Sequence, residues 1–137
     1  MKYIALAARI CLSLIFINAG VGKIFGFGGT VEMMASQGLP IPTILLIFTI
    51  AFQLLGSLSL LLGYKVKLGS ILLIVFLIPA TIAFHNPLVS PDELNNCLKN
   101  IGLIGGLLMT IYAGAGALSI DSASQRSKRQ QELTTNN

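Results

Sequence analysis

A small set of polar side chains could do chemistry in this sequence, because each lies in or beside a long apolar run. Arg9 interrupts the first run, and Ser13 and Lys23 follow it at offsets of four and fourteen residues, which places all three on one helix face. A charge inside an apolar helix faces other protein groups or water rather than lipid. We therefore predict that this face points toward neighbouring helices.

Position along the chain sorts the polar side chains into two layers at different membrane depths. The predicted inner layer comprises Arg9, Gln53 and Asp121. The predicted outer layer comprises Lys23, His85, Lys99 and Asn100. Arg9 and Asp121 could form an ion pair that fixes helix packing, or they could belong to a site for an anionic or quinone-like ligand. The ion pair is favoured, because lone charges in membranes are usually paired.

The chain lacks the residue sets of the common catalytic, metal and redox sites. His85 is its only histidine, and Asp92 and Glu93 are too few to predict a metal site beside it. Cys11 and Cys97 do not form a CxxC motif, and there is no haem ligand pair, iron–sulfur cysteine set or dinucleotide fingerprint. We predict no catalytic residues, no metal and no tightly bound cofactor, so enzymatic activity of the chain alone stays undecided.

The glycine-rich stretch GVGKIFGFGG, residues 20–29, suggests a phosphate loop at first sight. A Walker loop would need glycine where Ile17 stands and serine or threonine where Ile24 stands. An apolar helix precedes the stretch, where a nucleotide-binding unit would have a strand. We interpret it as the end of a membrane helix whose glycines let the chain leave the bilayer.

Composition and hydropathy patterning indicate what holds these residues. Apolar residues make up 54% of the chain and charged residues 10%, far below the roughly 25% of a soluble domain. Each apolar run is close to the about 20 residues that a spanning helix needs. The runs cover residues 4–22, 41–62, 68–84 and 101–118. We predict an all-α, polytopic membrane protein with a four-transmembrane-helix bundle over 1–121, and a retained first helix rather than a signal peptide.

The connecting segments and the tail set the expected topology. Thr30 could cap a short helix that Gly38 ends, and Ser90 or Asp92 could begin one helical turn. Residues 122–137 are polar, so we predict a disordered tail. Basic residues gather on the side of the tail, which predicts that both termini are cytoplasmic in the plasma (inner) membrane. They lack interleaved aromatic residues, so nucleic acid is not an expected partner.

The order of short motifs resembles the DoxX family over about residues 4–121. These motifs are AARICLSLIF, NAGVGKIF, AFQLLGSLSLLLGY, FH, KNIGLIGGLL and GAGALSID. The resemblance implies a small four-helix membrane protein, in which many relatives carry glutamate where this chain has Gln53. Its matching positions are Arg9, Gly20, Lys23, Gly63, His85, Lys99, Asn100, Gly105, Gly106, Gly114, Gly116, Ser119 and Asp121.

The resemblance also implies a function linked to redox chemistry. Relatives include a subunit of a thiosulfate:quinone oxidoreductase and membrane partners of soluble redox enzymes. We therefore expect a protein that binds quinone, or that serves as membrane subunit or anchor for a soluble redox enzyme. One alternative is a non-enzymatic scaffold, which could form homo-oligomers through its glycines. A small proton-coupled transporter is disfavoured, because no carboxylate lies within a predicted span before Asp121.

Overall fold

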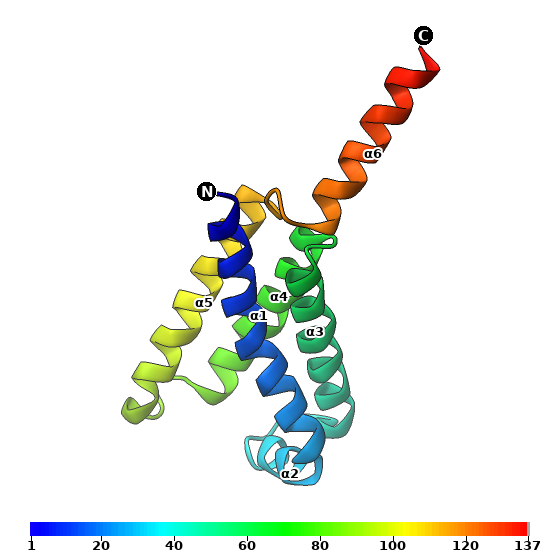
Figure 1. Ribbon diagram of the computed structural model, residues 1–137. Coiled ribbons are helices and arrows are strands. Elements are labelled where there is room, and N and C mark those ends of the chain that lie inside the picture. Colours follow the sequence, from blue (N-terminus) through cyan, green and yellow to red (C-terminus); the bar gives the residue numbers. More distant parts are fainter. Residues whose placement is uncertain (137) are drawn as a thin grey trace.

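The computed structural model describes residues 1–136, and within them the only regular elements are helices (Figure 1). This confirms the predicted all-α class. α1 packs on α3, α3 on α4, and α4 on α5, so that the long helices form one bundle. The elements are α1 (Lys2–Phe25), α2 (Phe27–Ser36), α3 (Pro42–Leu62), α4 (Val66–Phe84), the 3₁₀ turn η1 (Pro91–Glu93), α5 (Leu94–Ala113) and α6 (Ile120–Thr135).

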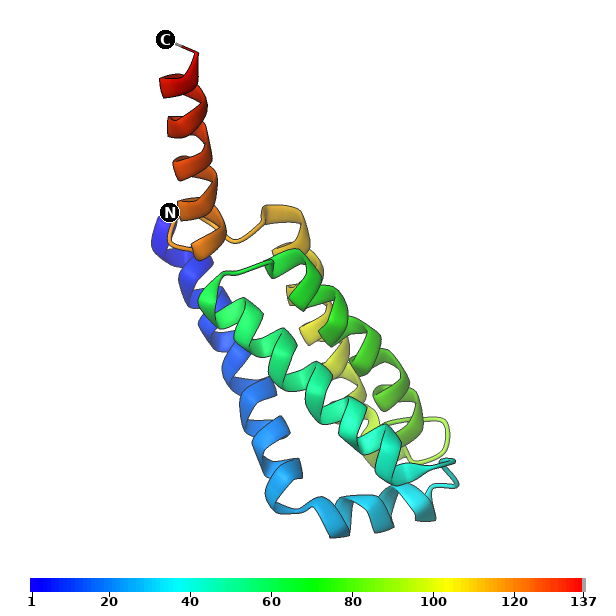
Figure 2. The ribbon, with the colours of Figure 1, turned by 90° about the vertical axis from the view of Figure 1, so that its right-hand side faces the viewer.

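The bundle has two distinct ends, which we call the tail end and the loop end. At the tail end lie the start of α1, the turn between α3 and α4, and the base of α6, which projects away from the bundle (Figures 1 and 2). At the loop end α2 turns aside from α1 (Figure 2), and η1 leads into α5. Met1 and the C-terminal helix therefore share one end, as the topology predicted.

Three helices, α1, α3 and α4, are long and apolar enough to cross a membrane. The outer faces of α3 and α4 are correspondingly apolar; for example, Leu55 and Ile82 are exposed. The first three predicted spans agree with these helices to within a few residues. α5 has 20 residues, but Asn95, Asn96 and Lys99 lie in its first two turns, so it is the least apolar of the long helices.

The predicted boundaries of the fourth span, 101–118, were wrong at both ends. α5 begins at Leu94, so Cys97 and Lys99 lie in a helix rather than in a loop. It ends at Ala113 because Gly114 and Gly116 take φ angles of 76° and 79°, in the left-handed region that favours glycine. The AGAGA stretch, residues 113–117, is therefore where the helix ends and not part of a continuous fourth span.

The prediction of a disordered tail over 122–137 was also wrong for the residues that the structure describes. Ser119 caps α6 by accepting a hydrogen bond from the backbone N–H of Ser122, and Asp121 lies in the first turn, where a negative charge favours a helix. Many of the following residues are good helix formers. None of the residues of α6 is buried, so the low apolar content predicted exposure correctly but not disorder.

The buried faces of the helices follow the predicted stripes closely. The buried residues of α1 are Arg9, Ser13, Phe16 and Gly20. α3 and α4 approach each other through Gly56 and Gly69: a Cβ built on either glycine would lie about 3 Å from the backbone oxygen of the other (2.9 and 3.0 Å). The apolar core contains Phe16, Leu60, Val66, Leu73, Leu77 and Leu107.

The short elements at the loop end partly match the prediction. α2 begins at Phe27, three residues before Thr30, whose hydroxyl bonds back to the Gly26 carbonyl instead of capping the helix. Gly38 takes a φ of 76° shortly after α2 ends, as expected of a helix stop. The predicted helical turn forms as η1, with Ser90 immediately before it.

Candidate functional site

Arg9 is the central polar residue of the tail end. Its side chain is 2% exposed. Its Nη1 donates a hydrogen bond to the Leu60 carbonyl at 3.1 Å, and its Nη2 donates to the carbonyl of Leu118. Ser13 in turn bonds the Arg9 carbonyl at 2.6 Å. The guanidinium thus joins α1 to the end of α3 and to the segment between α5 and α6.

Asp121 stabilises a neighbouring helix end and does not form the predicted ion pair with Arg9. Its carboxylate accepts the backbone N–H groups of Lys65 and Val66 at 2.8 and 3.2 Å. These groups are the free donors at the start of α4, where a negative charge is favoured. Arg9 and Asp121 therefore stabilise the same part of the tail end through different backbone groups. Their contacts do not support the alternative of a ligand site there.

A sizeable internal space lies at the loop end. A cavity of about 650 Å³ opens among α1, α2, α3, α4 and α5, a volume within the about 300–1,000 Å³ range of small-molecule sites. Most of its lining is apolar. The predicted outer-layer residues all contribute to its wall, and so does one residue assigned to the inner layer. The polar lining residues of the helices include Lys23, Thr49, Gln53, His85, Lys99 and Asn100.

Gln53 lies at the loop-end cavity, so its assignment to the inner layer with Arg9 was wrong. α1 and α3 are antiparallel, and the backbone of Gly20 approaches Leu54 and Gln53, whereas Arg9 reaches Leu60. Seven residues of helix separate Gln53 from that carbonyl, or about 10 Å. Gln53 is 2% exposed, and its Oε1 is fully buried with no hydrogen-bond partner among the described residues.

A polar network borders the cavity between α4 and α5. With Glu93 ionised, the Nδ1–H of His85 donates to its Oε2 at 2.6 Å, and Asn96 donates to the same oxygen at 2.8 Å. Lys99 reaches Asn96 at 3.4 Å. Within residues 1–136, no group of three His, Cys, Asp or Glu side chains is placed to hold a metal ion.

Deeper in the wall, the Asn100 amide donates to the Thr81 hydroxyl at 2.9 Å. Both side chains are buried. The Lys23 ammonium bonds the Ala19 carbonyl of its own helix at 3.4 Å. Lys23 therefore lines the cavity without a direct hydrogen bond to His85 or Asn100.

Sequence reasoning missed two members of the network, Glu93 and Asn96. We considered Glu93 only as a metal ligand and did not predict a hydrogen bond to His85. Its side chain and that of His85 are only about one-third exposed, and their contact joins η1 to the residue that follows α4. Asn96 follows Glu93 by three residues, the spacing of neighbours on a helix face, and this spacing could have indicated the contact.

The network makes the loop end sensitive to acid. Hydrogen bonds from Asn96 and then from His85 hold the pKa of the Glu93 carboxyl below its usual value. A lowered folded-state pKa means that this carboxylate stabilises the fold above the unfolded pKa of about 4.3, and that the contribution is lost as the pH falls through the folded pKa. We expect Asn96→Ala to raise the pKa of Glu93, measured by carboxyl NMR titration in micelles.

Asn95→Ala is the matched control for this titration. Asn95 is the adjacent residue on α5, is exposed, and forms no side-chain hydrogen bond among residues 1–136. The pKa of Glu93 should be the same in N95A as in the parent protein. A Glu93 carboxyl that titrates identically in all three proteins would show that Asn96 does not stabilise the carboxylate.

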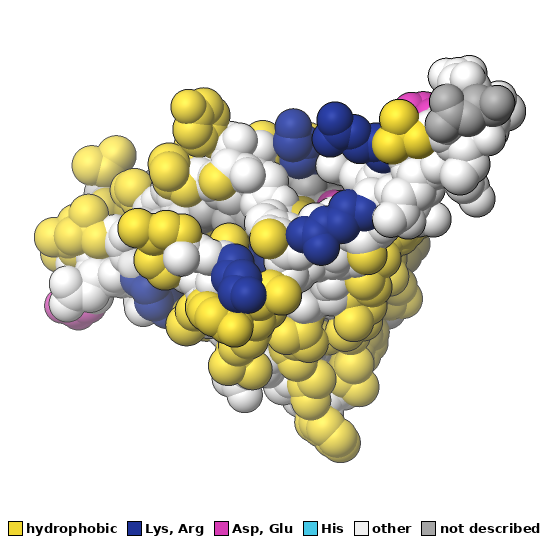
Figure 3. Space-filling model, turned by 45° about the horizontal axis from the view of Figure 1, so that its top comes forward, with side chains coloured by type: hydrophobic (Ala, Val, Ile, Leu, Met, Phe, Trp, Pro, Cys, Tyr) yellow, Lys and Arg dark blue, Asp and Glu magenta, His cyan; other side chains and the backbone are white. Residues whose placement is uncertain are grey.

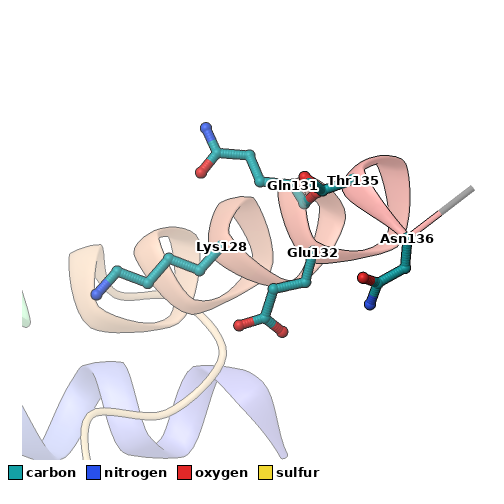
Figure 4. A pocket seen from close by; sticks show the side chains of 5 residues that line it. All are labelled: Lys128, Gln131, Glu132, Thr135 and Asn136. Carbon is teal, nitrogen blue, oxygen red and sulfur yellow. The ribbon is translucent and has the colours of Figure 1, made fainter.

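A second hollow lies on the projecting tail and does not have the features of a binding site. Every residue that lines it belongs to α6 or directly follows it, and Figure 4 shows their side chains spread along a single helix. No other described element forms an opposite wall. The lining residues are Lys128, Gln131, Glu132, Thr135 and Asn136.

The fold and the cavity together define a small helical membrane protein with a largely apolar internal space that a few polar side chains border. The DoxX family profile matches residues 4–86, which is more than half of the chain. The chain therefore belongs to the DoxX family, as the order of its motifs had implied. No solved structure matches the chain.

Curated relatives agree with this assignment. The chain is 32% identical over 122 residues to the inner membrane protein YphA of Escherichia coli, covering 85% of this chain and 86% of that protein. It is 32% identical over 116 residues to the inner membrane protein YqjF of the same organism, covering 85% and 88%. A 79-residue stretch is 34% identical to the ER-derived vesicles protein ERV29 of Saccharomyces cerevisiae, covering 54% of this chain and 26% of that protein.

Proposed function

We propose that this protein binds a quinone-type ligand in the loop-end cavity and serves as a membrane subunit or anchor for a soluble redox enzyme. The observation that carries the proposal is Gln53. Its amide lines an apolar cavity, and its Oε1 is buried without a protein partner. Such a group costs about 1–3 kcal/mol when it stays unpaired. The hydroxyl of a reduced quinone ring would donate to Oε1 and remove this cost, whereas a carbonyl of the oxidised ring would accept from the Nε2–H of the same amide.

The other polar groups of the cavity suit a ring that carries oxygens. Quinone carbonyls accept hydrogen bonds, and Lys23 supplies donors on the side of the cavity nearest the loops. With its Nδ1–H bonded to Glu93, a neutral His85 presents Nε2 as an acceptor, which suits the hydroxyl of a reduced ring. The partners of these two side chains in the protein are the Ala19 carbonyl and Glu93, which hold them at the cavity wall. Apolar residues such as Phe52 and Leu103 would contact the flat faces of the ring.

The tail end is the surface we assign to a soluble partner. Figure 3, which views the molecule with this end forward, shows Lys and Arg side chains gathered near the base of α6, with hydrophobic side chains on the flanks. Basic residues in short connections favour the cytoplasmic side of a bacterial-type inner membrane. We therefore propose that the tail end faces the cytoplasm and that a partner enzyme binds there, away from the cavity.

Replacing Gln53 with leucine separates ligand binding from stability. Leucine has a similar volume and leaves no buried oxygen unpaired, so we expect Q53L to melt at the same or a higher temperature than the parent. It removes one hydrogen bond to the ligand, so we expect affinity for a decyl-tailed ubiquinone analogue to fall about tenfold. Thermal melting and calorimetric titration in detergent measure the two effects.

The control is Gln130→Leu, the same chemical change on exposed α6, which should alter neither property. If Q53L binds the analogue as well as the parent does, Gln53 is not a ligand contact. If the parent shows no saturable binding, the quinone assignment is wrong, and the non-enzymatic scaffold becomes the better description.

A further inference from the structure

We infer that the cavity opens sideways into the bilayer between α3 and α4, and that its ligand is an amphiphile whose hydrocarbon tail lies in this opening while its polar head meets Gln53. The inference rests on the proposed function and adds the route and the ligand class. We call the opening the lateral portal, and it is framed by Phe48 on α3 and by Val75 and Pro79 on α4.

The packing of α3 against α4 changes along their length. Near the tail end the helices are in backbone contact, because Gly56 and Gly69 have no side chains to separate them. Toward the loop end, residues of the same two helices line the cavity instead, among them Phe48 on α3 and Ala80 and Ala83 on α4. The small side chains of these alanines leave room that bulkier ones would fill.

The residues that frame the portal both line the cavity and reach the outer surface. Phe48 is 58% exposed and Val75 is 53% exposed. Val75 lies in the middle of α4, and Phe48 is six residues inside α3, about 9 Å from its first residue. Both positions fall at the depth of the hydrocarbon core, so in a membrane the portal faces lipid chains rather than water.

The opposite side of the cavity has different chemistry. Charged and polar residues border it near the loops, including Lys23, Glu93 and Lys99. The charged residues of the cavity thus lie toward the membrane surface, and the residues that frame the portal are apolar. A ligand with one compact polar head and one long apolar chain matches this gradient, whereas a fully water-soluble ligand would leave the portal side unfilled.

Pro79 adds a polar feature to the portal. Proline has no N–H, so the Val75 carbonyl does not receive the helical hydrogen bond that residue 79 would otherwise donate. In hydrocarbon a free carbonyl needs a donor. A hydroxyl on the ligand, such as that of a reduced quinone ring, would supply one as the head passes the portal.

The test compares two probes that share one ring and differ in the tail. One is a ubiquinone analogue with a decyl tail, and the other carries a methyl group in its place. Val75→Trp adds bulk at the portal, and Ile82→Trp adds the same bulk on exposed α4 surface that does not line the cavity. We expect V75W to weaken binding of the decyl probe about tenfold, to leave the methyl probe unchanged, and I82W to change neither.

For each variant, the dissociation constant of a probe is divided by that of the parent protein in the same detergent. Partition of the probe into micelles affects both values equally and therefore cancels. Phe48→Trp, on the facing helix, repeats the test with a smaller change in case V75W does not fold. The chain has no tryptophan, so the emission of each introduced one also reports folding.

Three results would overturn the inference. Equal loss of both probes in V75W and F48W would mean that the substitutions damage the head site rather than obstruct a tail. Unchanged binding of both probes in V75W and F48W would mean that the tail of the ligand does not lie in the portal. If the parent binds the methyl probe but not the decyl probe, the cavity is a binding site for the ring, but the portal does not hold a hydrocarbon tail. If the parent binds neither probe, the proposed function itself is wrong.

Discussion

Arg9→Ala is expected to lower the free energy of unfolding by about 3 kcal/mol or more. The wild-type side chain donates charge-assisted hydrogen bonds to the carbonyls of Leu60 and Leu118, each worth about 1.5–3 kcal/mol. Alanine would leave both carbonyls without this donor in a buried corner, where water does not replace it easily. Equilibrium denaturation in mixed micelles, followed by circular dichroism, measures the loss.

Two further substitutions test whether the loss of stability depends on the guanidinium group at position 9. Arg9→Lys keeps the charge, but a single ammonium lacks the fork of donors that reaches two carbonyls, so we expect an intermediate loss. Arg126→Ala removes an arginine from exposed α6 and should change stability by less than about 0.5 kcal/mol. If R9A is as stable as the parent, Arg9 is not a structural residue, and its burial needs a ligand-based explanation.

Gly63→Ala is expected to be comparably destabilising, for two reasons that add. Gly63 has a φ of 69°, and a side chain in this left-handed region costs about 1–2 kcal/mol. A Cβ at this position would also collide with the Arg9 guanidinium and would lie 2.5 Å from the Cβ of Ser119. Overpacking of this kind costs about a further 1–3 kcal/mol. The same denaturation measurement applies.

Gly38→Ala separates the two contributions. Gly38 has a φ of 76°, but no atom lies within 4 Å of a Cβ built on it. Its replacement should therefore show the cost of the backbone conformation alone, about 1–2 kcal/mol. Equal losses in G38A and G63A would show that the contact with Arg9 and Ser119 relaxes without cost, and that the tail-end corner is less tightly packed than its geometry implies.

The helices and their buried faces were predictable because they follow from short-range periodicity. Arg9, Ser13, Phe16 and Gly20 share a face at helical spacing, and the structure buries all four. The end of α5 was not predictable in the same way. Glycines such as Gly114 and Gly116 suit both close helix contacts and left-handed turns, and only the path of the following chain selects between them.

The candidate site was predicted by residue type but not by contact. Lys23 and His85 do line one cavity. The membrane depth of Gln53 and the hydrogen-bond partners of Asp121 both depend on the axial position of each helix relative to its neighbours. Residue spacing within a single helix does not specify this position. The hydrogen bond between Glu93 and His85 was not predicted for a related reason. It joins residues on either side of a loop, and the conformation of that loop includes η1.

The bond from Arg9 to Leu118 also constrains how the protein is made. The donor lies in α1, and the acceptor lies 109 residues later in the chain, so it is synthesised well after the donor. Asp121, which stabilises the start of α4, is translated later still. The bundle therefore cannot close its tail end during synthesis of the first three long helices. Until residues 118–121 are synthesised, the side chain of Arg9, which is buried in the folded protein, must contact water, lipid headgroups or the insertion machinery.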